Sequence, residues 1–224
     1  MKTIILVNTN TIWGGGEKWH FNAATFLRKH GYNVIVTCSM GSPLWAKIKE
    51  HNFLFKTIKI SNLSFLNIFK LYYIYRWIKQ YRPHAVIITL PSDLKAFAPM
   101  CKLSGVKKII YRRGVSNQLK GLWLNKFLFK YVVDVVVANS QAVAESLCKN
   151  NAWFPKNKIH IITNGLIIDY KEQVQQLYHK ASQDEIVIGN ASRLIASKNH
   201  TFLIDLVQEL KNLNIKVKLL IAGD

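Results

Sequence analysis

Short apolar runs recur along the chain and alternate with segments whose apolar positions follow the helical period. A strand that is buried on both faces of a parallel sheet has no polar side, so each run predicts such a strand. The runs cover 4–8, 34–38, 85–90, 108–111, 132–138 and 159–163, and helical patterns cover 65–81 and 141–150. This alternation predicts an α/β fold with a doubly wound parallel sheet.

The first strand is followed by a glycine-rich turn. Gly14-Gly15-Gly16 lead into a helical pattern that places His20, Ala23, Ala24 and Leu27 on one face, and Gly31 is expected to cap the end of that helix. Since another strand follows at once, the opening predicts a parallel strand–helix–strand unit with a right-handed crossover.

The pattern changes after Gly165. We expect a first domain at 1–165, a polar connector at 166–185 and the start of a second domain at 186–224. That last segment predicts a strand from 186, a helix over about 199–213 and a strand at 217–222. One strand–helix–strand unit leaves a sheet edge open, so this second domain is expected to be incomplete.

Composition indicates a globular protein, because 50% of the residues are hydrophobic and 19% are charged. No apolar run is long enough to cross a bilayer, so a cytoplasmic protein is expected. The 3 cysteines are far apart, and neither a disulfide framework nor a metal site is expected.

The formal net charge is +19, and most of it is concentrated in one stretch. Between His51 and Val133 there are fifteen Lys or Arg residues and a single acidic residue, Asp93. Such a face attracts nucleic acid, anionic lipid headgroups or phosphorylated substrates, and charge alone does not distinguish these partners.

Two segments are candidates for binding phosphate. The glycines Gly14, Gly15 and Gly16 would let a ligand approach the start of a helix, where free amides favour an anion, or they form a flexible turn. Arg193 and Lys198 lie in a loop between a strand and a helix, where they can converge on a diphosphate, or they are solvated surface cations.

Further candidates lie at the expected carboxyl edge of the first sheet, where ligands bind in such folds. Asp93 can orient or deprotonate an acceptor hydroxyl, or Ser92 or Asp93 can cap the following helix. His20 is a second catalytic candidate because it is expected on the inward face near the glycines. Arg112 and Arg113 suit a phosphorylated or carboxylated acceptor, or they are ordinary surface cations.

The helical segment 65–81 mixes aromatic and basic side chains. This combination suits an anionic membrane surface, where rings lie at headgroup level, but it also fits a helix with aromatic core residues and solvated cations.

Four strings in order along the chain resemble retaining glycosyltransferases of the GT-B fold, of the family four type. They are the triple glycine with Glu17, Ala138-Asn139-Ser140, Ile161-Ile-Thr-Asn-Gly165, and the stretch 186–200, IVIGNASRLIASKNH, which ends in LLIAGD at 219–224. The resemblance implies two Rossmann-like domains, an acceptor-side domain followed by a donor-binding domain. In that pattern Ala191 replaces a frequent Gly, and Asn199-His200 replace the usual Gly after the Lys.

The resemblance also implies an activity, the transfer of a sugar from a UDP- or GDP-sugar with retention. No metal or other cofactor is expected. Arg193, Lys198 and the glycines Gly14, Gly15 and Gly16 would bind the donor, and the acceptor would be a cell-surface glycan, as in lipopolysaccharide or capsule, or a lipid-linked molecule. A lipid-linked acceptor would place the enzyme on the inner face of the cytoplasmic membrane. The family's paired glutamates lie beyond the end of this sequence, so the 224-residue chain is expected to be a fragment, inactive alone.

Two other classes compete with this interpretation. A basic nucleic-acid-binding protein would use the positive face, although the aromatic residues follow no known module and Arg193 and Lys198 would have no role. A nucleotide-cofactor dehydrogenase is disfavoured because Cys38-Ser39-Met40, rather than an acid, stand at the end of the second strand.

Overall fold

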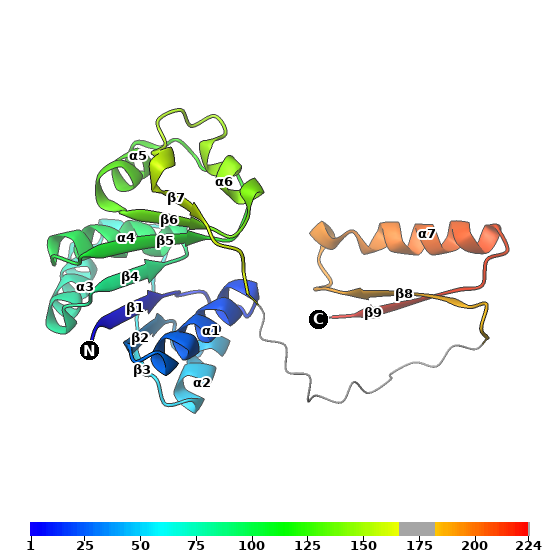
Figure 1. Ribbon diagram of the computed structural model, residues 1–224, viewed down its shortest axis with the longest axis horizontal. Coiled ribbons are helices and arrows are strands. Elements are labelled where there is room, and N and C mark those ends of the chain that lie inside the picture. The colour runs from blue at the N-terminus through cyan, green and yellow to red at the C-terminus, as the bar shows by residue number, and fades with distance from the viewer. Residues whose placement is uncertain (166–181, 224) are drawn as a thin grey trace. The chain divides into compact units, whose positions relative to one another are not determined.

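The computed structural model describes residues 1–165 and 182–223 (Figure 1). The chain divides into two compact units, Met1–Leu166 and Ile167–Asp224, which are considered separately. The expected connector, 166–185, lies outside the described residues except for 182–185. None of the helices in the described ranges combines the length and apolarity that a membrane crossing requires.

The first unit is built on a parallel sheet of seven strands in the order β3-β2-β1-β4-β5-β6-β7. The chain adds strands on one side of β1 and then returns to its other side with β4, so the direction of winding reverses between these two strands. The strands are β1 (Thr3–Val7), β2 (Asn33–Cys38), β3 (Leu54–Thr57), β4 (Ala85–Ile88), β5 (Lys108–Arg113), β6 (Val135–Ala138) and β7 (Ile159–Ile161).

Helices cover both faces of this sheet, which confirms the doubly wound fold (Figure 1). Along β1, Ile5 and Val7 pack in one core with α3 and α4, while Leu6 packs in the other core with α1 and α2. The helices of this unit are α1 (Gly15–Lys29), α2 (Pro43–Glu50), α3 (Ile68–Tyr81), α4 (Pro91–Leu103), α5 (Trp123–Phe127) and α6 (Gln141–Cys148), with short turns η1 (Ser64–Leu66), η2 (Leu128–Val132) and η3 (Lys156–Lys158).

Several boundaries differ from the expectation for local reasons. The helix expected over 65–81 begins only at Ile68, because the Asn67 side chain accepts the Lys70 amide and caps α3. The strand expected from Val132 begins at Val135, because 128–132 form a π-helix whose apolar side chains belong to the same core. Gly31 has a φ of 80° just after α1, which confirms its capping role.

The Lys158 side chain, in the turn before β7, hydrogen-bonds to the end of the π-helix η2. Its Nζ atom donates to the carbonyl oxygens of Phe129 at 3.0 Å, Lys130 at 3.0 Å and Val133 at 2.6 Å. A cation suits these carbonyls because the end of a helix carries partial negative charge.

We expect Lys158→Met to lower the free energy of unfolding by about 2 kcal/mol, since three carbonyls lose a charged donor. The measurement is chemical denaturation followed by tryptophan fluorescence, because all 6 tryptophans lie in the first unit. The control is Lys156→Met, a neighbouring exposed lysine, which should cost less than about 0.5 kcal/mol. Equal losses in the two variants would contradict the assignment.

The second unit, as far as it is described, has two parallel strands and one long helix. Strands β8 (Ile186–Ala191) and β9 (Val217–Ala222) pair from Ile186 opposite Val217 to Ala191 opposite Ala222. The turn η4 (Ala196–Lys198) and helix α7 (His200–Asn212) connect them. The strand–helix–strand expectation for 186–222 is therefore confirmed.

Candidate functional site

A cavity of about 430 Å³ opens at the carboxyl edge of the first sheet. Its wall includes Asn8 after β1, Leu90 after β4 and Arg112 of β5, together with Gly16 and Glu17 at the start of α1. These elements meet where the strand order reverses, between β1 and β4. Open α/β sheets bind their ligands at this position, so the cavity is the candidate functional site of the first unit.

The glycine turn leaves room beside the start of α1. Gly14 is the N-cap, and no side chain caps the helix. A Cβ atom added at Gly15 or Gly16 would meet nothing within 4 Å, and neither residue has a positive φ. The fold itself therefore does not require glycine at these two positions. Of the three glycines, only Gly16 lines the cavity.

The turn after β1 is tied to α1 by a buried polar network. The Glu17 carboxylate accepts hydrogen bonds from the Asn8 and Asn10 side-chain amides, each at 3.0 Å. Asn8 Nδ2 also lies 3.5 Å from His20 Nδ1. These contacts fix the position of the glycine turn relative to the end of β1.

His20 contacts this network through Asn8 and does not line the cavity. It is fully buried, and its Nδ1 atom is 3.2 Å from the Gly16 carbonyl oxygen. Desolvation by burial lowers its pKa to about 4, although the Gly16 carbonyl acts in the opposite direction. His20 is thus a neutral side chain at pH 7 that supports the start of α1.

Asp93 joins α4 to the turn after β1. Its Oδ2 accepts the Thr9 amide at 3.0 Å, and its Oδ1 accepts the Thr9 hydroxyl at 2.6 Å. The side chain is completely buried, and desolvation raises its pKa to about 6 despite these hydrogen bonds. The capping interpretation is wrong, because the N-cap of α4 is Leu90 and no side chain caps that helix.

Arg112 brings a buried positive charge to the cavity. It is 6% exposed, its guanidinium carbon lies 4.6 Å from the centroid of the Trp19 ring, and its Nη2 donates to Asn164 Oδ1 at 3.0 Å. Within 1–165 and 182–223 no carboxylate forms an ion pair with it, and desolvation lowers its pKa. A buried cation without a carboxylate partner favours binding of an anion.

Arg113 has a different environment, although it also lines the cavity. Its Nε donates to the Val115 carbonyl at 3.1 Å, and its Nη2 donates to the Asn117 carbonyl. These bonds hold the loop that follows β5. The two arginines therefore differ in role, because Arg113 shapes the wall and Arg112 supplies charge.

In the second unit, Arg193 and Lys198 lie in the loop between β8 and α7. Both side chains are exposed, and neither forms a hydrogen bond or ion pair among the described residues. Asn199, the N-cap of α7, has φ 50° and ψ 48° and makes no side-chain capping bond. Asn tolerates this left-handed conformation better than most residues, which explains how it replaces a glycine there.

The sequence profile of Glycosyltransferase Family 4 matches residues 13–170. The chain belongs to glycosyltransferase family 4. No curated protein sequence gives a significant match. The match covers the glycine turn, Glu17 and the cavity wall apart from Asn8.

Solved structures share the fold of this family 4 chain. A glycosyltransferase from Rickettsia africae ESF-5 has a TM-score of 0.72 at 17% identity, over 100% of this chain and 69% of its own. Anabaena Alr3699/HepE in complex with UDP has a TM-score of 0.68 at 15% identity, over 99% of this chain and 69% of its own. The lipopolysaccharide outer core galactosyltransferase WaaB in its apo form has a TM-score of 0.66 at 16% identity, over 100% of this chain and 69% of its own. The fold is thus the Rossmann-like fold of GT-B glycosyltransferases.

The family match supports neither of the competing classes. No observation favours nucleic-acid binding, and the helix after the glycine turn belongs to a family 4 domain rather than to a dehydrogenase. Among the described residues, no group of three or more His, Cys, Asp and Glu side chains is arranged to hold a metal ion.

Several residues of the site are not found by sequence reasoning. Asn8 donates to Glu17, the Trp19 ring lies beside the Arg112 guanidinium, and Thr9 donates both hydrogen bonds that Asp93 accepts. Asn8 and Thr9 directly follow β1, one of the two strands between which the strand order reverses. Their position at the end of this strand is the sequence feature that could have indicated a role in the site.

Proposed function

We propose that this family 4 protein transfers a sugar from a nucleotide-sugar to a cell-surface glycan or lipid-linked acceptor, with retention at the anomeric carbon. The observation that carries the proposal is the cavity at the reversal of strand order, with Arg112 as a buried cation in its wall, in a chain of this family. The acceptor would bind in the first unit, and the donor mainly in the second.

On the donor side, Arg193 and Lys198 would bind the diphosphate of a UDP- or GDP-sugar. Two cations without a partner among residues 1–165 and 182–223, beside the open start of α7, suit a group whose negative charge grows as the glycosidic bond to the nucleotide breaks. No metal or other cofactor is invoked. HepE, which shares the fold, was solved with UDP and with UDP-glucose, which favours a uridine nucleotide as the first probe.

On the acceptor side, Arg112 would contact a phosphate or carboxylate of the acceptor, and Arg113 would hold the loop around it. The family resemblance assigns Gly14, Gly15 and Gly16 to the donor, and of these we place only Gly16 against it, because Gly16 alone of the three lines the cavity. His20 and Asp93 were candidates for catalysis, and we now assign them positioning roles, since both are completely buried and outside the cavity wall.

The cavity assignment is tested with inorganic phosphate as the probe. Arg112→Met keeps a long side chain over Trp19 but removes the charge, so we expect phosphate to bind at least roughly tenfold more weakly, as measured by its protection of the first unit against thermal unfolding. Lys102→Met, an exposed site on α4, removes the same charge and should leave protection unchanged. Equal loss in both variants would show that phosphate binds only through the general charge.

The glycine turn gives a second test, because its glycines are not required by the fold. Gly15→Ala and Gly16→Ala should each raise the free energy of unfolding by about 0.5–1 kcal/mol, since alanine restricts the unfolded chain. Only Gly16→Ala places a methyl group in the cavity wall, so it alone should weaken UDP-glucose binding measured by calorimetry. A loss of stability at either position would contradict the account.

We also propose that residues 1–224 have no transferase activity alone. The described part of the second unit pairs two strands with a single long helix, which leaves one face of the sheet without cover. Binding measurements are therefore the appropriate assays for this chain. With a lipid-linked acceptor, the protein would act at the inner face of the cytoplasmic membrane.

A further inference from the structure

The helix after the cavity loop exposes large apolar side chains on one side. Leu122, Trp123, Phe127 and Tyr131, here called the α5 surface, are all exposed, and Trp123 reaches 75%. Trp123, Phe127 and Tyr131 are spaced four residues apart, and the rings of the last two lie 5.8 Å apart. Side chains of this size in a contiguous patch indicate a surface that contacts a partner.

A second apolar patch lies where η1 leads into α3. Leu63, Leu66, Ile68 and Phe69, here called the η1 corner, are between 68% and 84% exposed. Aliphatic side chains at this level of exposure gain most from a hydrocarbon environment.

Both patches are connected to the cavity. Leu122 of the α5 surface lines the cavity itself. Lys95 also lines the cavity, and its Nζ lies 5.6 Å from the ring centroid of Phe65, which lies between Leu63 and Leu66 in the sequence. The α5 surface therefore reaches the cavity directly, and the η1 corner is linked to it through Phe65 and Lys95.

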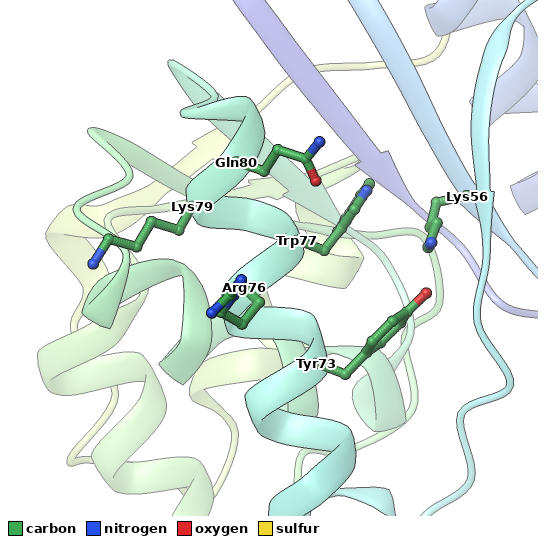
Figure 2. A pocket seen from close by; sticks show the side chains of 6 residues that line it. All are labelled: Lys56, Tyr73, Arg76, Trp77, Lys79 and Gln80. Carbon is green, nitrogen blue, oxygen red and sulfur yellow. The ribbon is translucent and has the colours of Figure 1, made fainter.

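The surroundings of these patches are strongly basic. Residues 94–133 contain nine Lys or Arg residues and no acidic residue, and Lys126 and Lys130 flank the aromatic side chains of the α5 surface. Beyond the η1 corner, a shallow groove of about 400 Å³ between β3 and α3 brings Lys56 to 5.0 Å from the Tyr73 ring, with Trp77 beside it (Figure 2). The partner must accordingly be anionic as well as apolar.

These properties distinguish between classes of partner. A second copy of this chain would bring the same basic surface against itself, and the repulsion disfavours a symmetric dimer. Nucleic acid offers negative charge but no hydrocarbon for Leu66, Ile68 or Phe69. An anionic bilayer offers both, since aromatic rings lie at headgroup depth and lysines meet the lipid phosphates.

We propose that the mouth of the cavity lies against an anionic lipid bilayer, with the α5 surface and the η1 corner inserted at headgroup depth. An amphiphilic acceptor would then enter the cavity from the lipid side. That consequence rests on the proposed transferase function, whereas membrane binding itself does not.

The test is flotation of the 224-residue chain with vesicles of phosphatidylcholine alone or with about one third phosphatidylglycerol, without any nucleotide. We expect binding to the anionic vesicles that weakens with salt. Trp123→Ser with Phe127→Ser should weaken it at least roughly tenfold, and Lys126→Gln with Lys130→Gln roughly 10- to 30-fold. Matched controls on other surfaces, Phe26→Ser with Leu103→Ser and Lys29→Gln with Lys49→Gln, should change it less than about twofold.

A conservative variant checks that the indole itself enters the bilayer. Lipids brominated in their acyl chains should quench tryptophan fluorescence of the wild type, and Trp123→Phe should retain binding but lose most of the quenching. The proposal is overturned if the α5 variants and their controls bind alike, if quenching is unchanged in Trp123→Phe, or if light scattering reveals a Trp123-dependent dimer. Because no donor is present, these outcomes are independent of whether UDP binds.

Discussion

Arg193→Ala combined with Lys198→Ala is expected to weaken UDP binding by about 100-fold or more. Each cation would donate charged hydrogen bonds to the diphosphate, and the loss of two such contacts corresponds to roughly 3–6 kcal/mol. The measurement is the broadening of the diphosphate signals in phosphorus NMR when UDP or, in a parallel sample, GDP is titrated with the chain. This readout detects weak binding and needs no turnover.

The control for this experiment lies in the same unit. Lys211→Ala with Lys216→Ala removes the same charge from two exposed lysines, one in the last turn of α7 and one just before β9, away from the loop after β8. We expect this variant to broaden the signals as the wild type does. Equal loss in both double variants would mean that UDP binds only through net charge.

The second large effect concerns the pH dependence of stability, where His20 and Asp93 act in opposite directions. His20 binds fewer protons in the folded state, because its pKa falls from 6.5 to about 4, so its contribution to stability increases as pH rises from about 4 to 6.5. Asp93 binds more protons in the folded state, because its pKa rises from 3.8 to about 6, so its contribution decreases as pH rises over that window. Each contribution amounts to about 3 kcal/mol.

A variant that lacks one of the two side chains should therefore show the pH dependence of stability that the other contributes. Between pH 4 and 6.5, the unfolding free energy of His20→Asn should fall relative to the wild type, and that of Asp93→Asn should rise, by about 3 kcal/mol each. The measurement is urea denaturation at several pH values with tryptophan fluorescence. The double variant serves as the control and should run parallel to the wild type. Slopes of the same sign in the two single variants would contradict the assigned pKa shifts.

Most of the fold could be predicted because buried parallel strands leave a strong pattern. β1, β2, β4 and β9 lie at or within two residues of the expected apolar runs. The edge strand β3 was missed, since it pairs only with β2 and its Leu54 and Phe55 are exposed. Helix α2 was also missed, although Ser42 followed by Pro43 is a typical helix start and the Ser42 hydroxyl caps it.

The candidate site was predictable only at the level of strand ends. A strand end can be read from an apolar run, so Arg112 and Asp93 could be placed at the carboxyl edge. Partners that are distant in sequence could not be found, such as Thr9 for Asp93 or Trp19 and Asn164 for Arg112, because they depend on which strands lie next to each other. For the same reason, the different environments of the neighbouring Arg112 and Arg113 could not be distinguished.

Amide hydrogen exchange of the chain with and without UDP tests the central claim most directly, namely that the loop between β8 and α7 binds a nucleotide diphosphate. The account predicts slower exchange with UDP at the amides of 195–200, around η4 and the start of α7. That protection should be lost in the Arg193→Ala, Lys198→Ala variant. Unchanged exchange in this loop at a UDP concentration that saturates the NMR signal would contradict the account.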